Sequence, residues 1–240
     1  MIQLGIFGKG RLAGAIVDQL PAHPSLALAW QIDETGSPQK ADVVVDASLA
    51  NAVPGHLQWA METGTNIVIG ATGWDPSILD KVGKEIGVLV APNFSLTVAF
   101  AQRLALVLGR YAALDSENDP YIVEHHHRKK ADAPSGTAKA LAEAVLKGCP
   151  RKTIVSTTTH EPHELHVASI RAGHEFGFHT VGLDAPGETL KLEHQVRSRA
   201  VFGDGALRAG EWIVGKKGVY TFSDMAGEVL NPIFKIDKEF

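Results

Sequence analysis

Six consecutive residues of this 240-residue chain, His125 to Lys130, have side chains that can carry positive charge, within the stretch EHHHRKKADAPSGTA. The formal net charge of the chain is −4, so this positive charge is a local feature. Pro134 and Ser135 then lead into an expected helix at Gly136, where backbone N–H groups and the Thr137 hydroxyl can bind an anion. A basic run beside a helix start favours an anionic substrate, and we expect a dicarboxylate.

Three of these residues, His125, His126 and His127, are consecutive histidines, which raises the question of a metal site. Neighbouring residues on a strand point to opposite faces, so the three side chains cannot all bind one ion. The stretch has neither a cysteine nor an HxxxH pattern to complete a zinc site. A histidine that donates a proton near neutral pH, beside a lysine, fits general acid catalysis better, and we expect no bound metal.

A glycine-rich turn near the amino end has the pattern of a dinucleotide-binding loop. Residues 8–14, GKGRLAG, fit GxGxxA between an expected strand and an expected helix. Gly8 permits a tight turn, Gly10 lets a pyrophosphate approach the backbone, and the helix start offers free N–H groups. The alternative is a purely structural turn, because many tight turns share this pattern.

An acidic residue, Asp33, lies at the end of the expected second strand, 25 residues after Gly8. A carboxylate at that place accepts hydrogen bonds from the ribose hydroxyls of NAD. Lys9 and Arg11 could instead pair with the 2′-phosphate of NADP, whereas Glu34 adds no positive charge. These residues favour NADH and leave NADPH open, and an ordinary turn acid is the other interpretation of Asp33.

Composition describes an ordinary globular protein, with 45% hydrophobic and 21% charged residues. The 23 basic and 27 acidic side chains and a pI near 6.2 argue against a nucleic-acid or membrane-surface binder. The single cysteine, Cys149, cannot form a disulfide within the chain, and no apolar run approaches the roughly 18 residues of a membrane span. We expect a soluble cytoplasmic protein whose first residues belong to the fold rather than to a targeting leader.

The first ninety residues alternate short apolar runs with helix-like segments. We expect strands at 2–7, 26–32, 43–46, 66–69 and 88–91, and helices at 12–20, 53–62 and 77–86. Apolar strands without alternation are typical of strands buried on both faces. The pattern predicts an α/β fold with a Rossmann-like, doubly wound parallel sheet.

The second half has a different pattern. We expect a long apolar helix at 98–111, a strand that runs into the histidines, and a helix at 136–147. Four later stretches, VSTTT, HVASIRAG, FGFHTVG and TLKLEHQV, predict an open mixed sheet, and a last helix at 206–214 and GVYTF close the chain. We therefore expect a dinucleotide-binding domain at 1–97, completed by 206–240, and an α+β substrate and oligomerisation domain at 98–205.

The stretch EHHHRKKADAPSGTA resembles the signature of the 4-hydroxy-tetrahydrodipicolinate reductases, formerly dihydrodipicolinate reductases, which reads E-x-H-H-x-x-K-x-D-A-P-S-G-T. The sequence matches every specified position: Glu124, His126, His127, Lys130, Asp132, Ala133, Pro134, Ser135, Gly136 and Thr137. GATG at 70–73, APNF at 91–94, IRAG at 170–173 and the surroundings of His179 and His194 are similar to further family stretches. The resemblance covers nearly the whole chain.

The resemblance implies an NAD(P)H-dependent reductase of a cyclic imine dicarboxylate, in lysine biosynthesis through diaminopimelate, assembled as a homotetramer through the second domain's sheet. It implies that His126 is the proton donor and acceptor and Lys130 a second proton donor. His127, Gly136 and Thr137 would bind substrate. The implied cofactor contacts are Gly8, Lys9, Gly10, Arg11, Leu12, Ala13, Asp33, Gly70, Ala71, Thr72, Ala91, Pro92, Asn93 and Phe94.

Four positions depart from the family pattern. Ala47 and Ala50 stand where D-F-[ST]-x-P has an aromatic residue and a proline, Thr97 replaces a glycine, and Phe178 replaces the acid of G-E-H. Other functions remain compatible with the sequence: a dehydrogenase of another small anionic imine or aldehyde, a catalytically silent NAD(P)-binding sensor, or a structural or assembly protein.

Overall fold

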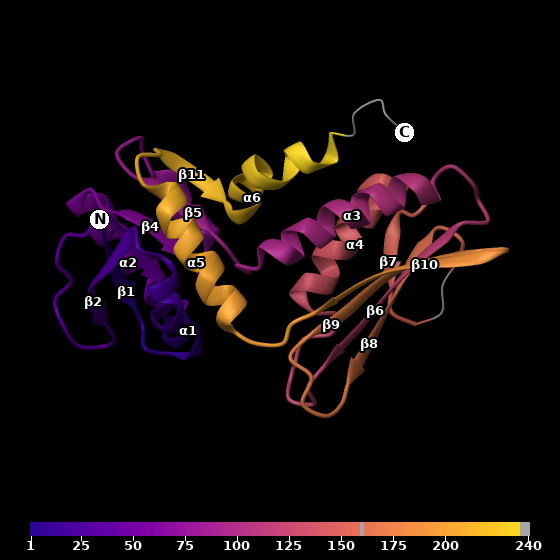
Figure 1. The fold of residues 1–240 in the computed structure, drawn as a ribbon, viewed down its shortest axis with the longest axis horizontal. Coiled ribbons are helices and arrows are strands. Elements are labelled where there is room, and N and C mark those ends of the chain that lie inside the picture. Colours follow the sequence, from indigo (N-terminus) through magenta and orange to yellow (C-terminus); the bar gives the residue numbers. More distant parts are fainter. Residues whose placement is uncertain (159–160, 236–240) are drawn as a thin grey trace. The chain divides into compact units, whose positions relative to one another are not determined.

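The computed structural model describes residues 1–158 and 161–235, and the chain divides into two compact units (Figure 1). The first unit combines Met1–Ser95 with Arg199–Phe240, and the second is Leu96–Ser198. The return to the first unit comes earlier than the expected boundary at 205/206, because helix α5 begins at Ala200. A search of the described residues finds no helix long and apolar enough to span a membrane.

In the described part of the first unit, six parallel strands form one sheet in the order β11-β5-β4-β3-β1-β2. These strands are β1 (Ile2–Phe7), β2 (Leu26–Ile32), β3 (Val43–Asp46), β4 (Asn66–Ile69), β5 (Gly87–Val90) and β11 (Gly218–Thr221). The strand order runs outward from β1 in both directions, which confirms the doubly wound parallel topology. Strand β3 is buried along its whole length, as its unbroken apolar run predicts.

Four α-helices accompany this sheet within the described residues: α1 (Arg11–Gln19), α2 (Val53–Thr63), α5 (Ala200–Ile213) and α6 (Phe222–Leu230). Helix α1 follows the glycine turn directly, so its amino end lies at the carboxyl end of β1. Helices α1 and α5 pack closely at Gly203, where an added Cβ would lie 2.2 Å from the Ala15 carbonyl oxygen. Short 3₁₀ helices occur at Leu20–Ala22, Pro76–Lys81 and Asn231–Phe234.

Two helix predictions in this unit need correction. The α-helix expected at 77–86 is wrong, because only the 3₁₀ helix Pro76–Lys81 forms and the chain becomes extended at Val82 before it reaches β5. Helix α6 is not predicted by the sequence pattern, in which GVYTF closes the chain. Its start is a capping box in which the Thr221 hydroxyl accepts from the Asp224 N–H and the Asp224 carboxylate accepts from the Thr221 N–H.

The second unit contains a mixed sheet, which confirms the prediction of such a sheet. Its strand order is β10-β9-β6-β8-β7. Its strands are β6 (Asp119–His126), β7 (Ile154–Ser156), β8 (Glu164–Arg171), β9 (Phe178–Ala185) and β10 (Glu188–Gln195). Strands β6, β8 and β7 are parallel neighbours, whereas β9 is antiparallel to both β6 and β10. The strand expected in VSTTT (155–159) is observed as β7 and ends at Ser156. The last residue of that stretch, Thr159, lies outside the described residues.

Helices α3 (Leu96–Ala112) and α4 (Gly136–Gly148) pack on one face of this mixed sheet (Figure 1). Their apolar side chains form a core with Ile122 of β6, Val167 of β8 and Val181 of β9. Residues of β6 alternate, so that Glu124 and His126 are buried on the same side as Ile122. Two polar, ionisable side chains therefore lie at the edge of an apolar core.

The close contact of α1 with α5 gives a stability prediction. We expect Gly203→Ala to lower the free energy of unfolding by about 1–3 kcal/mol, because the new methyl group overlaps backbone and outweighs the better helix propensity of alanine. Gly210→Ala in the same helix is the control, since its Cβ would meet only Val43 at 3.8 Å, an ordinary contact. Urea unfolding followed by tryptophan fluorescence measures both, and equal effects of the two changes would contradict the packing argument.

Candidate active site

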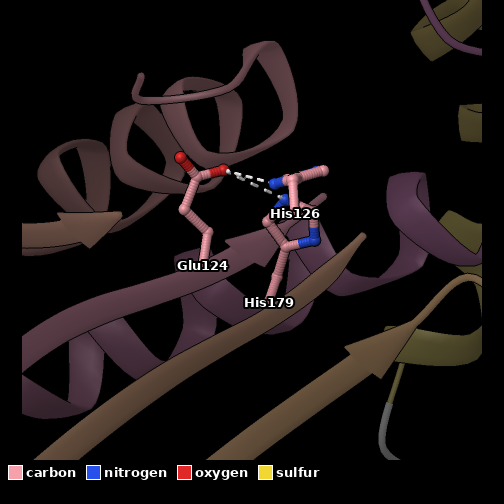
Figure 2. A group of neighbouring side chains, drawn as sticks. All are labelled: Glu124, His126 and His179. Atoms are coloured by element: carbon pink, nitrogen blue, oxygen red, sulfur yellow. Dashed lines mark ion pairs between the residues drawn. The ribbon is translucent and has the colours of Figure 1, made fainter. Parts of the chain in front are cut away.

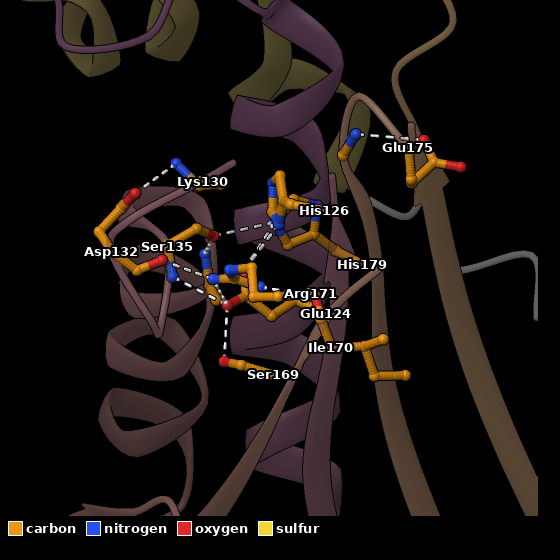
Figure 3. A network of polar contacts seen from close by, with 12 residues as sticks. Glu124, His126, Lys130, Asp132, Ser135, Ser169, Ile170, Arg171, Glu175 and His179 are labelled. Atoms are coloured by element: carbon orange, nitrogen blue, oxygen red, sulfur yellow. Dashed lines mark hydrogen bonds and ion pairs between the residues drawn. The ribbon is translucent and has the colours of Figure 1, made fainter. Parts of the chain in front are cut away.

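A fully buried carboxylate, that of Glu124 on β6, is the centre of a polar network in the second unit (Figure 3). Its Oε1 accepts from the Ser135 backbone N–H at 3.0 Å, the Ser169 hydroxyl at 2.6 Å and the Arg171 guanidinium at 2.7 Å. Burial by itself raises the pKa of Glu124, but these hydrogen bonds outweigh burial and lower the pKa to about 2. The side chain is therefore an anion at neutral pH.

The other carboxylate oxygen, Oε2, faces two histidines (Figure 2). Nδ1 of His126 lies 3.2 Å away and Nε2 of His179 lies 3.8 Å away. His126 is only 6% exposed, and burial lowers its pKa, while the charge of Glu124 acts in the opposite direction. Burial also lowers the pKa of His179, to about 4. Both rings are thus held near a fixed negative charge in a site that disfavours their charged forms.

The spacing of Glu124, His126 and His179 is also one that a metal ion could use, since their ligand atoms lie within 4.8 Å of one another. The three consecutive histidines do not converge: His125 is partly exposed, and its Nε2 is 3.0 Å from the Ala172 carbonyl oxygen. The carboxylate of the cluster already pairs with the guanidinium of Arg171. That neighbouring positive charge favours a carboxylate–imidazole pair over a bound cation.

The loop after β6 places a lysine beside this pair. Lys130 forms an ion pair of 2.7 Å with Asp132, and its charge contributes to lowering the pKa of His126. The backbone of the loop is fixed by hydrogen bonds from the His127 N–H to the Glu175 carbonyl and from the Arg171 guanidinium to the Asp132 carbonyl. The expected catalytic residues, His126 and Lys130, therefore lie in one site.

The start of α4 adds an anion-binding element to the same site. The Ser135 hydroxyl accepts from the Ala138 N–H at 3.1 Å and lies 3.2 Å from Nε2 of His179, so this N-cap joins the helix to the network. Gly136 is exposed, with open space where a side chain would stand, and the first turn holds no acidic residue. A carboxylate can approach the positive end of the helix at this place.

The first unit contains a cavity of about 1050 Å³ at the carboxyl ends of its strands. Among the expected cofactor residues, those that line it are Gly8, Lys9, Gly10, Arg11, Leu12, Asp33, Gly70, Pro92, Asn93 and Phe94. The remaining four, Ala13, Ala71, Thr72 and Ala91, are not part of its lining. Ala13 is fully buried, which suits a residue that lets helix and strand pack closely.

Several lining residues were not predicted from the sequence. Ala47, Ser48 and His56 follow the carboxyl end of β3, where the strand order reverses and nucleotide folds bind their ligand. His56 is held by the buried carboxylate of Asp46, 2.8 Å from its Nδ1, and stacks on Phe7 with ring centroids 3.7 Å apart. Arg199 and Phe202 complete the lining from a distant part of the chain, and the resemblance of the stretch after His194 to the family is the one sequence signal that points to them.

The partners of Glu124 were also missed, although the stretches that contain them resembled the family. Strand pairing explains how they meet: Glu124 lies beside Ser169 on β8 and beside His179 on β9, and His126 lies beside Arg171. This register is a property of the assembled sheet, and no spacing within the sequence predicts it.

The comparisons with known proteins agree with this geometry. Residues 2–94 match the model described as "Dihydrodipicolinate reductase, N-terminus", and residues 94–226 match "Dihydrodipicolinate reductase, C-terminus". The chain belongs to the dihydrodipicolinate reductase family. This membership favours the enzyme over the sensor and the structural protein that the sequence had left open.

Relatives in this family cover most of the chain. A 4-hydroxy-tetrahydrodipicolinate reductase of Magnetococcus marinus is 36% identical, over 90% of this chain and 84% of its own length. One from Laribacter hongkongensis is 30% identical, over 91% of this chain and 95% of its own length. The fold is similar to that of a dipicolinate-bound dihydrodipicolinate reductase from Paenisporosarcina sp. TG-14, with a TM-score of 0.77, 19% identity, and coverage of 94% and 99% of the two chains.

The buried histidines give a prediction for acid stability. The pKa of His179 is about 4 in the fold against 6.5 for a free histidine, so the unfolded chain binds more protons between these values. The contribution of the neutral His179 ring to the free energy of unfolding is therefore fully present above about pH 6.5 and is lost as the pH falls toward 4. Glu124, lowered from 4.5 to about 2, extends the loss below pH 4.5. We expect His179→Asn to flatten the pH dependence between pH 6.5 and 4.

Urea unfolding at several pH values, followed by circular dichroism, measures this pH dependence. His174→Asn is the control, because His174 is exposed. An identical slope in the wild type and in His179→Asn would contradict the assignment of His179 as a buried neutral histidine.

Proposed function

We propose that the protein is a 4-hydroxy-tetrahydrodipicolinate reductase that uses NADH or NADPH to form tetrahydrodipicolinate, in lysine biosynthesis through diaminopimelate. The observation that carries this proposal is the Glu124–His126 pair, with Lys130 and the exposed helix start at Gly136 beside it. The relatives of 28–36% identity, all named for this reaction, support it. We place the activity in the cytoplasm, as expected for a biosynthetic enzyme.

The residues around the cavity of the first unit fit a nicotinamide dinucleotide. Helix α1 begins after Gly10 without a side-chain cap, and Gly10 has open space above its backbone, so its N–H groups can bind a pyrophosphate. Lys9 and Arg11 line the same cavity and add positive charge near the phosphates. Asp33 and Glu34 line it at the end of β2, where the adenosine ribose of such cofactors binds.

The reaction adds one hydride and one proton to the substrate and releases one water. The bound dinucleotide supplies the hydride. His126 supplies a proton, because its ring is the buried imidazole that the Glu124 carboxylate holds in place. Lys130 supplies the proton with which the hydroxyl leaves as water, and its charge stabilises negative charge that develops in the ring. Loss of water also removes one proton from a ring carbon next to the leaving hydroxyl, so the net uptake is one hydride and one proton.

Binding of the dicarboxylate is assigned to the groups beside this proton donor. Gly136 presents the positive end of α4, and Thr137 follows it in the first turn. His127 lies directly after the strand that carries the proton donor, and it is partly exposed. Together with Lys130 these groups offer cationic and N–H partners for two carboxylates in a chain whose net charge is −4.

We propose a preference for NADH. Asp33 and Glu34 together place two negative charges where a 2′-phosphate would bind, and their repulsion outweighs the attraction of Lys9 and Arg11, which line the same cavity.

We also propose the homotetramer. Tyr121, Val123 and His125 project from the face of the mixed sheet opposite α3 and α4, and among the described residues of this unit no helix covers them. Sedimentation equilibrium of the full chain tests that assembly.

Cofactor oxidation measures this function directly. We expect both NADH and NADPH to be oxidised when the substrate is generated in the assay from pyruvate and aspartate semialdehyde, with the larger kcat/KM for NADH. His126→Ala should lower kcat about 100-fold or more, the usual contribution of a general acid. His174→Ala, outside the network, should leave kcat unchanged. If neither cofactor is oxidised, the proposed function is wrong. Near-normal turnover by His126→Ala would contradict the role of His126 as proton donor.

A further inference from the structure

The two oxygens of the Glu124 carboxylate have different partners. Oε1 is occupied by three donors, from Ser135, Ser169 and Arg171. Oε2 has no hydrogen bond among the described residues, and neither has Nδ1 of His126, although both atoms are buried and lie 3.2 Å apart. Two buried polar atoms at this distance are satisfied if one proton lies between them.

We propose that Glu124 is a positioning residue for His126: its Oε2 holds the proton on Nδ1, which leaves Nε2 as the ring nitrogen that exchanges protons with the substrate. This inference rests on the proposed function, because it concerns the proton donor of that reaction. It assigns a role to a residue that the sequence motif contains without explaining.

Tautomer choice is the first reason. A neutral imidazole carries its proton on either nitrogen, and the one that is protonated is set by the hydrogen bond of the other atom. Glu124 is an anion and only accepts, so it selects the tautomer with the proton on Nδ1. Nε2 has no hydrogen-bond partner among the described residues, since the side-chain interactions of His126 are the contact of Nδ1 with Glu124 and the ring contact with His179.

Fixed geometry is the second reason. The donors to Oε1 come from the start of α4 and from β8, so the carboxylate is clamped from two elements and does not depend on His126 for its orientation. The ring of His126 is in turn confined by His179, at a centroid distance of 5.0 Å and a near-perpendicular angle of 75° (Figure 3). A rigid acceptor beside a confined ring fixes the direction in which Nε2 points.

Room at the reacting nitrogen is the third reason. A Cβ added at Gly177 would lie 3.0 Å from Nε2 of His126, closer than ordinary packing allows. The glycine therefore leaves that nitrogen unobstructed on the side of β9. The two ring nitrogens thus have opposite surroundings, a carboxylate at Nδ1 and a glycine at Nε2.

Charge balance is the fourth reason. The charged or titratable groups that act on His126 are Glu124 on its own strand, Lys130 and Asp132 in the following loop, Arg171 on β8 and His179 on β9. The cations disfavour a positive ring, and Glu124 is the largest opposing charge. When Nε2 takes up a proton, Glu124 stabilises the imidazolium that results.

Glu124→Gln is the discriminating variant. Its carbonyl oxygen can still accept from Ser135, Ser169 and Arg171, but its NH₂ group would face Nδ1 and favour the opposite tautomer. We expect kcat to fall about 100-fold or more, while the KM for NADH stays within a few fold. The pH above which kcat declines should move lower, because the charge that raises the pKa of His126 is gone. His174→Ala, an exposed position outside the network, should leave this pH profile unchanged.

A second measurement does not depend on activity or on the variant. In the wild-type protein labelled with ¹⁵N-histidine, with the signals of His126 identified by their loss in His126→Asn, NMR at a pH where the His126 ring is neutral should show a proton on Nδ1 and a bare Nε2. A neutral ring with its proton on Nε2 and a bare Nδ1 would overturn the inference whatever the substrate is, and so would Glu124→Gln turnover within three-fold of wild type. A wild type with the expected tautomer that oxidises neither cofactor would instead overturn the proposed function and leave the tautomer assignment supported.

Discussion

The burial of one negative charge is the constraint on which the second unit depends. An ionised carboxylate inside a protein costs several kcal/mol unless charge-assisted hydrogen bonds compensate. The Glu124 side chain is fully buried, and its compensation comes from the Ser135 N-cap at the start of α4 and from Ser169 and Arg171 on β8. The pairing of β6 with β8 and the start of α4 must therefore both be in place before the buried charge is compensated. The apolar core between the sheet and its helices lies next to this carboxylate.

The first unit also has a buried carboxylate, that of Asp46, at the carboxyl end of strand β3. Gly8 has a φ of +102°, and a Cβ there would lie 2.6 Å from the Ala47 carbonyl oxygen, so the two loops that line the cavity can approach only because that residue is glycine. The buried carboxylate of Asp46 then fixes Ser48 and His56 at the cavity wall. The departure at Ala47 leaves this wall with a small side chain in place of an aromatic ring.

Prediction from the sequence succeeded where local pattern and physical need coincide. The first four strands lie where their apolar runs placed them. Strand β3 and most of β4 are buried, and such strands consist of an unbroken apolar run. Strand β2, at the edge of the sheet, has an apolar run although it is partly exposed. Prediction failed for the helix expected at 77–86, which ends at Lys81 because Val82 takes an extended conformation, and for α6, whose capping box at Thr221 adjoins a strand. In both cases the ends of elements, and not their apolar content, decided the result.

The sequence by itself determined the chemistry: a histidine and a lysine within a basic loop, a helix start beside them, and a glycine turn after the first strand. These are local features, because charge, capping and turn conformation depend on residues a few positions apart. Only the tertiary structure decided which partners complete the site. The pairing of β6 with β8 and β9 brings Ser169, Arg171 and His179 to Glu124, and Arg199 reaches the cavity of the first unit from more than a hundred residues away. Register and packing join distant segments, and no spacing along the chain encodes them.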